Sequence, residues 1–337
     1  MLSVSTMIAP APAVAYRSVQ RQLATLLPSE SWTDAPAALE LSSIGALEAP
    51  RLVAASIIEG KTLQPHAIIG APEPRFHAFL DGTQISRAIA HVDAIPIVYG
   101  SVAGVIRVRV DRRMRTWESP RLRHAIYAPL PLLPDEWKKA LGSTNARVVD
   151  TLEHRKPESL HPFALQDAAV HAVQEDREAV ERELAEHWCE PRATVGGTLF
   201  VDGAITGSEV VAQSPLAVGV IKSHRTLYAE GEDLRCVLRL AAGARTSVFR
   251  ITSPRRTPVA SWYLRLREPS GHDPLWGLVR VEIAEERGAA SGKVAKRANE
   301  VSRWVLAETL PLSVPDGRWD KMVYGIRDCE EFLRAIQ

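Results

Sequence analysis

The chain has 337 residues and carries 41 Lys and Arg against 40 Asp and Glu, a formal net charge of +1. A nearly neutral chain does not coat nucleic acid through its overall field, so any contact with a polyanion must come from local clusters of cations. The three cysteines form no Cys-x-x-Cys pair, which argues against a disulfide framework or a zinc site and fits a reducing compartment.

The sequence predicts a cytoplasmic protein outside the membrane. Its apolar runs stay below the roughly eighteen residues that indicate a transmembrane helix. Residues 1–15 are apolar and end in small residues, but they lack a positively charged start, and Pro10 and Pro12 interrupt them. We therefore expect no signal peptide.

The first 70 residues are predicted to form a helical extension. Mixed apolar spacing indicates helical stretches at 16–27, 37–49 and 51–58, which we expect to serve packing or dimerisation. A Gly-Ala-Pro-Glu-Pro turn at 70–74 then breaks the chain. We take residues 71–337 as the main domain because this turn separates two differently patterned parts.

Short apolar runs predict strands through most of the main domain. Residues 76–81 form a run that closes on an Asp81-Gly82 turn, and 198–203 repeats this with Asp202-Gly203. Further strands are predicted at 94–100 and 103–110, joined by a Gly-Ser turn, and at 216–221, 235–240, 246–251, 261–267 and 278–283. Helices are predicted at 164–188, 293–306 and 328–336, with an irregular, proline-broken region at 126–164. This alternation indicates an α/β or α+β fold with a mixed sheet.

Two apolar strands that each end in Asp-Gly suggest a metal site. Open α/β sheets place ligands at strand ends, and two carboxylates there repel each other unless a cation lies between them. Mg²⁺ and Mn²⁺ prefer such oxygen ligands, and two of these ions about 3.5–4 Å apart can hydrolyse a phosphodiester. The alternative is that Asp81 and Asp202 only complete ordinary turns.

The long predicted helix at 164–188 offers a third carboxylate. Its candidates are Glu175, Glu178, Glu181, Glu183 and Glu186. Glu181 flanks the apolar stripe of the helix, so we favour it as the ligand. The alternative is that all five form a solvated face with Arg–Glu pairs one turn apart.

Clusters of cations provide candidate contacts to DNA. Lys222 follows a predicted strand, where it either neutralises a scissile phosphate or is an exposed loop cation. Trp262 and Tyr263 either stack on bases or belong to the core. The candidate DNA-binding arginines are Arg112, Arg113, Arg245, Arg250, Arg255 and Arg256. The arginines around Arg112 equally suit an edge strand that charge protects from aggregation.

From Asp81 onward the sequence resembles the NurA nuclease family. The resemblance is an ordered series of short motifs over about the last three-quarters of the chain. The motifs are FLDGT at 79–83, the acidic helix after Arg177, LFVDG at 199–203, VGVIKSHR at 218–225, ARTSVF at 244–249, WYLRL at 262–266, VRVE at 279–282, LPL at 310–312 with Asp316 and Arg318, and YGI at 324–326 with Glu330.

The resemblance implies a ribonuclease-H-like core, a requirement for Mn²⁺ or Mg²⁺, and cleavage of DNA as a 5′-to-3′ exonuclease and single-strand endonuclease. It also implies a homodimer that works with a HerA-type hexameric ATPase in DNA end processing. The family's two strand-end aspartates correspond to Asp81 and Asp202, and its helix glutamate corresponds to Glu181, with Glu178 as the alternative. Lys222 lies in the family's valine–glycine–lysine stretch.

The C-terminal part departs from the archaeal members of that family. They carry a tyrosine and a histidine around the Pro-Leu segment, where this chain has Glu308 and Asp316, as bacterial members do in part. We therefore expect Asp316 to be a fourth acidic ligand. The departure also keeps a second hypothesis open, a catalytically idle dimeric adaptor that binds DNA or the ATPase.

Overall fold

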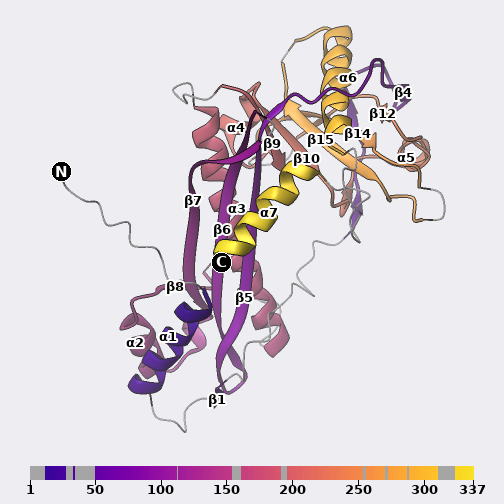
Figure 1. The fold of residues 1–337 in the computed structure, drawn as a ribbon. Helices are drawn as coiled ribbons and strands as arrows, with labels where there is room; N and C mark the ends of the chain where they lie inside the picture. The colour runs from indigo at the N-terminus through magenta and orange to yellow at the C-terminus, as the bar shows by residue number, and fades with distance from the viewer. Residues whose placement is uncertain are drawn as a thin grey trace.

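The computed structural model describes residues 12–27, 33–34, 50–111, 113–153, 161–190, 196–252, 256–269, 272–286, 288–309 and 323–337. Within these residues, 13 strands form one mixed sheet, and helices cover both of its faces (Figure 1). The fold class is therefore α/β with a large mixed sheet. None of the described helices is long and apolar enough to cross a membrane.

Five strands make the centre of the sheet, in the order β7-β6-β5-β9-β10. Their bounds are β5 (Phe76–Val92), β6 (Ile95–Val110), β7 (Arg113–Ala128), β9 (Thr198–Asp202) and β10 (Ala217–Ile221). The long strands pair antiparallel with one another, β5 with β6 and β6 with β7, whereas β9 runs parallel to both β5 and β10. Because β9 is short, its parallel pairing with β5 ends part-way along β5, and this junction positions the candidate site.

Shorter strands extend the sheet on both sides. β8 (Arg147–Asp150) pairs with β7, and β1 (Thr33–Asp34) pairs with β5. Beyond β10 follow β15 (Leu278–Ala284), β14 (Val259–Arg265), β13 (Phe249–Ile251) and β3 (Ser56–Ile57), while β12 (Ala244–Thr246) pairs with β14 and β4 (Pro65–Ala67). A separate pair joins β11 (Thr226–Leu227) to β2 (Arg51–Leu52).

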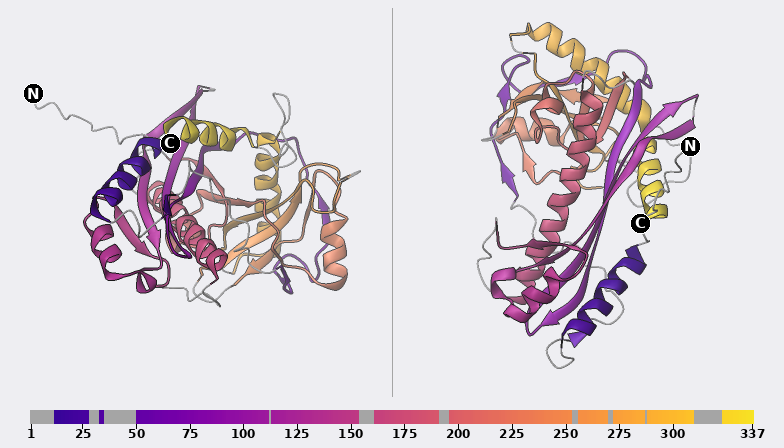
Figure 2. Two further views of the ribbon diagram at one scale, coloured as in Figure 1. Left: turned by 90° about the horizontal axis from the view of Figure 1, so that it is seen from below. Right: turned by 90° about the vertical axis from the view of Figure 1, so that its left-hand side faces the viewer.

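The helices divide between the two faces of the sheet. Their bounds are α1 (Pro12–Leu26), η3 (Leu130–Leu132), α2 (Asp135–Gly142), α3 (Pro162–Cys189), α4 (Glu209–Gln213), α5 (Gly231–Leu238), α6 (Ser291–Glu308) and α7 (Tyr324–Ile336). In the right-hand view of Figure 2, α3 lies on one side of the long strands and α7 on the other. The buried clusters on these two faces form the main core, and α1 and α2 close a third cluster at the far end of the long strands.

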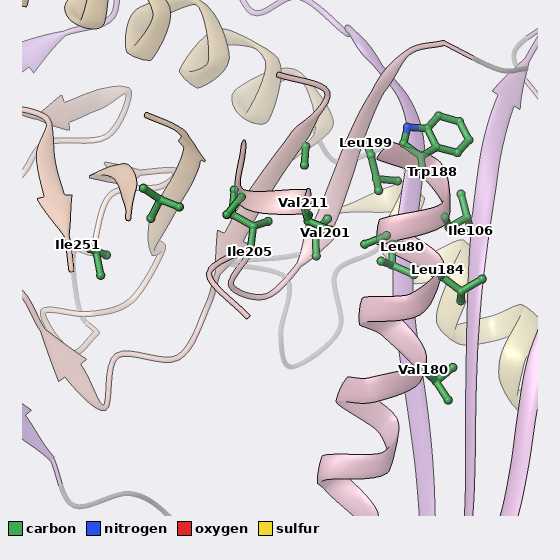
Figure 3. Packing of buried hydrophobic residues seen from close by; sticks show 14 of the residues in the cluster. Leu80, Ile106, Val180, Leu184, Trp188, Leu199, Val201, Ile205, Val211 and Ile251 are labelled. Atoms are coloured by element: carbon green, nitrogen blue, oxygen red, sulfur yellow. The ribbon is translucent and has the colours of Figure 1, made fainter. Parts of the chain in front are cut away.

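The packing of α3 against the sheet depends on apolar side chains at helical spacing. Val180, Leu184 and Trp188 of α3 meet Leu80 of β5 and Ile106 of β6 (Figure 3). All five side chains are 1% exposed or less. Burying a side chain of this size stabilises the fold by about 1.5–3 kcal/mol, so this contact holds α3 firmly over the centre of the sheet.

Glycines in the long strands allow this close approach. Gly82 of β5 pairs with Gly104 of β6 beneath α3. A Cβ added at Gly104 would lie 2.8 Å from Cγ1 of Val180, and one at Gly100 would lie 2.4 Å from the Tyr127 ring. These glycines therefore make room for the helix and for neighbouring side chains in extended strands, rather than forming turns.

Several predicted elements are confirmed, and others are wrong. The helices α3, α6 and α7 and the strands β9, β10, β14 and β15 lie where the periodicity predicted them. The predicted turns at Asp81-Gly82 and at Gly100-Ser101 are wrong, because β5 and β6 run through both positions. A glycine required by a packed helix carries the same sequence signal as a glycine required by a turn.

The predictions for 235–240 and for the start of the chain also need correction. Residues 231–238 form α5, with Glu232 and Asp233 in its first turn, and a short apolar run alone does not distinguish a helix from a strand. The stretch 51–58 forms β2 and β3 instead of a helix. Strands before residue 70 thus join the sheet. Of the three predicted helices in this part of the chain, the structure confirms the first, as α1. Residues 37–49 lie outside the described residues. The predicted strand 246–251 is divided between β12 and β13.

Candidate active site

Asp81 and Asp202 lie side by side at the junction of β5 and β9. The parallel register pairs Leu80 with Val201, so the next residue on each strand is one of the two aspartates. β9 ends at Asp202, and Gly203 leaves the strand at a φ of 144°, a conformation that favours glycine. Asp81 remains inside β5 and is 6% exposed. The sequence predicts both aspartates at strand ends. This is confirmed for Asp202 and wrong for Asp81, which lies in mid-strand.

Glu181 of α3 brings a third carboxylate to this junction. Its Oε1 lies so close to Gly82 that an added Cβ there would be 2.2 Å away. The side chain of Glu181 is 15% exposed, whereas that of Glu178 is 52% exposed. Glu181 rather than Glu178 is therefore the helix glutamate that faces the sheet, because it follows the buried stripe of α3.

Burial and the neighbouring carboxylates disfavour the charged forms of Asp81 and Glu181. Desolvation, followed by the charges of Asp202 and Glu181, raises the pKa of Asp81 well above its ordinary value. Desolvation also raises the pKa of Glu181 to about 7, although Arg177 opposes this and Glu178 and Asp202 add to it. The carboxylates are therefore close enough to repel one another in a poorly solvated place.

Two cations already pair with this acidic cluster, defined here as Asp81, Glu181 and Asp202. Lys222 Nζ lies 2.8 Å from Oδ2 of Asp202. Arg177 donates to Oε1 of Glu181 at 2.6 Å. The alternative reading of Lys222 as an exposed loop cation is wrong, since its side chain is 28% exposed and faces Asp202.

The residues of the acidic cluster match a hard divalent cation in kind. Carboxylate oxygens are the ligands that Mg²⁺ and Mn²⁺ prefer, and a cation among them would remove the repulsion that raises the pKa values. Their present spacing is not that of a ligand set: among the described residues, no group of three or more His, Cys, Asp or Glu is arranged to hold a metal ion. Asp202 and Glu181 are each turned toward a basic side chain, and Oδ1 of Asp81 accepts from the Gly82 amide.

Two cavities flank the junction, one on each face of the sheet. On the α3 side, a cavity of about 330 Å³ is bounded by Glu181, Asp202, the turn 203–207 and three arginines. On the α7 side, a cavity of about 480 Å³ is lined by Asp81 and by Glu330 of α7. Both are within or near the range of small-ligand sites, so the acidic cluster is reached from two directions.

Comparison with known proteins identifies no relative of this chain. Neither a scan against protein-family models nor a search of curated proteins finds a match. The resemblance to the NurA family therefore stays a prediction, and the site is judged by its own residues.

The candidate DNA-binding arginines have different environments. Arg245 is 4% exposed and donates to both carboxylate oxygens of Glu59, so its expected contact with DNA is wrong: it belongs to a buried ion pair. Arg250 pairs with Glu285, although its side chain is 40% exposed. Arg113 is exposed at the start of β7, and Arg256 lines the cavity on the α3 side. Arg112, Arg255 and the expected ligand Asp316 lie outside the described residues.

Other polar and aromatic candidates are structural. Trp262 and Tyr263 are fully buried, which contradicts a base-stacking role for either. Glu308 is buried and accepts from Arg109, and therefore joins α6 to β6.

Three residues beside the acidic cluster have no role predicted from the sequence: Arg177 and Arg182 of α3, and Glu330 of α7, which the sequence marks only as the last residue of the NurA-like motifs. Each lies in a cavity beside the acidic cluster. For the two arginines a signal existed in their position on the helix, since Arg177 lies one turn before Glu181 and Arg182 follows it directly. For Glu330 none did, since its place depends on how α7 packs.

Proposed function

We propose that this chain is a metal-dependent DNA nuclease that hydrolyses phosphodiester bonds at the acidic cluster. One observation carries the proposal: carboxylates from two neighbouring parallel strands and a helix converge on one junction, where burial and the neighbouring carboxylates raise the pKa of Asp81 and of Glu181. Asp81 is the least solvated of the three at 6% exposure, and no ion pair joins it to a basic side chain among the described residues. A structural role gives no reason to keep it there, since an unpaired buried carboxylate destabilises a fold. When bound, Mn²⁺ or Mg²⁺ supplies Lewis-acid polarisation of the phosphate and a nucleophilic water.

The chain's own residues have distinct roles in this proposal. Asp81, Glu181 and Asp202 bind the metal. Lys222, which lies 2.8 Å from Asp202, is placed to neutralise the scissile phosphate as negative charge develops on it. Arg177 orients Glu181 through their ion pair while Gln84 accepts a hydrogen bond from Arg177 at 3.2 Å. Each side chain is thus held by a neighbour, as a preorganised site requires.

The topology supports a ribonuclease-H-like core as part of the proposal. Such a core has three antiparallel strands followed by a helix and two parallel strands. Here β5, β6 and β7 are followed by α3 and then by the parallel strands β9 and β10, with the short elements η3, α2, β8 and α4 interposed. The acidic cluster lies where β5, β9 and α3 meet, at the centre of this arrangement.

The mode of action and the partners are proposed on the resemblance. They are single-strand endonuclease and 5′-to-3′ exonuclease activity, a homodimer, and work with a HerA-type hexameric ATPase in DNA end processing. Asp316 remains the proposed fourth ligand.

A second candidate is a catalytically idle adaptor that binds DNA or the ATPase. The observation that favours it is that Lys222 and Arg177 already neutralise Asp202 and Glu181. In that reading the basic side chains permanently take the place of the metal, and the acidic cluster is an ion-pair network.

Calorimetric titration with Mn²⁺ and a cleavage assay on labelled single-stranded DNA distinguish the two candidates. Wild type is expected to bind Mn²⁺ and to cleave, whereas Asp81→Asn and Asp202→Asn lose cleavage and bind the ion weakly while keeping the wild-type circular dichroism spectrum. Asp135→Asn is the matched control, because Asp135 is 87% exposed on α2. Wild type that neither binds Mn²⁺ nor cleaves would exclude the nuclease and leave the adaptor. Cleavage retained by either site variant would show that the acidic cluster is not the active site.

A further inference from the structure

The cavity on the α3 side contains two arginines, Arg182 and Arg256, that form no ion pair with an acidic side chain of the described residues. Arg182 forms no hydrogen bond or ion pair with any other described residue, and Arg256 donates one long bond of 3.4 Å to Thr206 Oγ1. Both side chains are exposed. Nearby arginines behave differently: Arg177 pairs with Glu181, and Arg123 pairs with Glu183.

These arginines come from separate parts of the chain and converge on one place. Arg182 follows Glu181 directly on α3, whereas Arg256 precedes β14, and the turn after Asp202 lies in the same cavity wall. A Cβ at Gly203 or Gly207 of that turn would meet nothing within 4 Å. The wall is therefore open there, and a ligand can reach both guanidinium groups together with Glu181 and Asp202.

We propose that Arg182 and Arg256 form a subsite for a backbone phosphate of a single-stranded nucleic acid, next to the phosphate that would lie over the acidic cluster. The inference rests on the proposed function, because the neighbouring phosphate exists only if a strand is bound there. A guanidinium group presents a planar fork of donors that matches phosphate oxygens. Two such groups beside a cluster of carboxylates attract the strand to a place that the carboxylates alone repel.

The subsite also explains how an overall neutral chain engages a polyanion. With a net charge of +1, the chain offers little long-range attraction, so affinity depends on local cations. The cavity of about 330 Å³ is at the small end of ligand sites and suits one nucleotide unit. Arg182 and Arg256 are positioning residues in this scheme, since they hold the strand without touching the reacting phosphorus.

The test compares Arg182→Gln, Arg256→Gln and the double variant with wild type. The control is Arg239→Gln, an exposed arginine at the end of α5, at the distant side of the sheet (Figure 1). Binding of fluorescein-labelled oligothymidylate is measured by anisotropy over a series of salt concentrations, in an Asp202→Asn background so that no strand is cut. Cleavage of the same oligonucleotide with Mn²⁺ is measured in the variants that retain Asp202.

For a single strand, each lost phosphate contact reduces the slope of log K against log salt by about 0.7. Because both arginines hold the same phosphate, we expect the double variant to lose about one such increment of slope and to raise KM much more than it lowers kcat, while Arg239→Gln matches wild type. A variant that were merely misfolded would lower kcat and stability together.

The outcomes separate the two ideas. Wild type that cleaves while the double variant keeps the wild-type salt slope and KM overturns the subsite and leaves the nuclease proposal intact. Binding that depends on both arginines in a protein that does not cleave supports the subsite and overturns the nuclease. If the Asp202→Asn protein does not bind oligothymidylate and wild type does not cleave it, both fail.

Discussion

Replacing Glu181 by glutamine is expected to stabilise the fold at alkaline pH. The carboxyl group of Glu181 has its pKa raised from 4.5 to about 7, first by desolvation and further by Glu178 and Asp202, against the opposing effect of Arg177. Its side chain is 15% exposed, so solvent screens it little. Glutamine resembles the protonated form in shape and charge, and thus removes the unfavourable charge while keeping an oxygen that accepts from Arg177.

The direction follows from proton linkage. The native state holds the Glu181 proton more tightly than the unfolded chain does, so the free energy of unfolding falls as pH rises between the two pKa values, 4.5 and about 7. Below pH 4.5 the carboxyl is neutral in both states, and Glu181 does not lower the free energy of unfolding. Above it, the native state carries the full penalty.

The magnitude follows from the same two values. A tenfold change in a dissociation constant corresponds to about 1.4 kcal/mol, so the penalty reaches roughly 3 kcal/mol at pH 8 and roughly 1 kcal/mol at pH 5. Glu181→Gln should therefore exceed wild type in stability by about 2 kcal/mol more at pH 8 than at pH 5.

Urea denaturation followed by circular dichroism at the two pH values measures this difference. Glu175→Gln on the same helix is the control, because its side chain is 55% exposed and a surface substitution changes stability by about 0.5 kcal/mol or less. A Glu181→Gln protein no more stable than wild type at pH 8, or an advantage independent of pH, would refute the reasoning that the carboxylates crowd one another. This assay needs neither metal nor DNA.

Two further substitutions test the packing beneath Glu181 and the buried ion pair of Arg245. Gly82→Ala places a Cβ 2.2 Å from Oε1 of Glu181, so we expect it to displace that carboxylate, to cost about 1–3 kcal/mol and to weaken Mn²⁺ binding in calorimetry. Gly142→Ala, with open space around it, should do neither, and equal effects of both would contradict the proposed contact. Arg245→Ala leaves Glu59 buried without its partner, which is expected to cost about 3–5 kcal/mol in urea denaturation; a loss below about 1 kcal/mol would show that the pair is not a buried structural one.

Part of the site could be predicted from local patterns. The apolar run before Asp202 and Gly203 identifies a strand and its end, because a short apolar run and the turn residue that follows it both lie within a few neighbouring positions. The same holds for α3, where a stripe at helical spacing places Glu181 beside the buried face. The sequence therefore names the three carboxylates, but it does not show that they meet.

The remaining features depend on contacts between residues far apart in the chain. The sequence predicts a turn at Gly82, but Gly82 lies in a strand and leaves space for the side chain of Glu181. Only the packing of α3 shows whether this glycine serves a turn or a close contact. The burial of Arg245 depends on Glu59, which is 186 positions away.

By itself, the sequence determined the helices α3, α6 and α7, the strands β9, β10, β14 and β15 and the chemical types available to the site, since these follow from the spacing of apolar and acidic residues over a few turns. The tertiary structure decided the register that sets Leu80 beside Val201, and with it the adjacency of Asp81 and Asp202. It also decided which arginines pair with buried carboxylates and which line the cavity on the α3 side. The physical reason is that strand register and burial arise from long-range pairing, where one residue of slip would turn every side chain to the other face of the sheet.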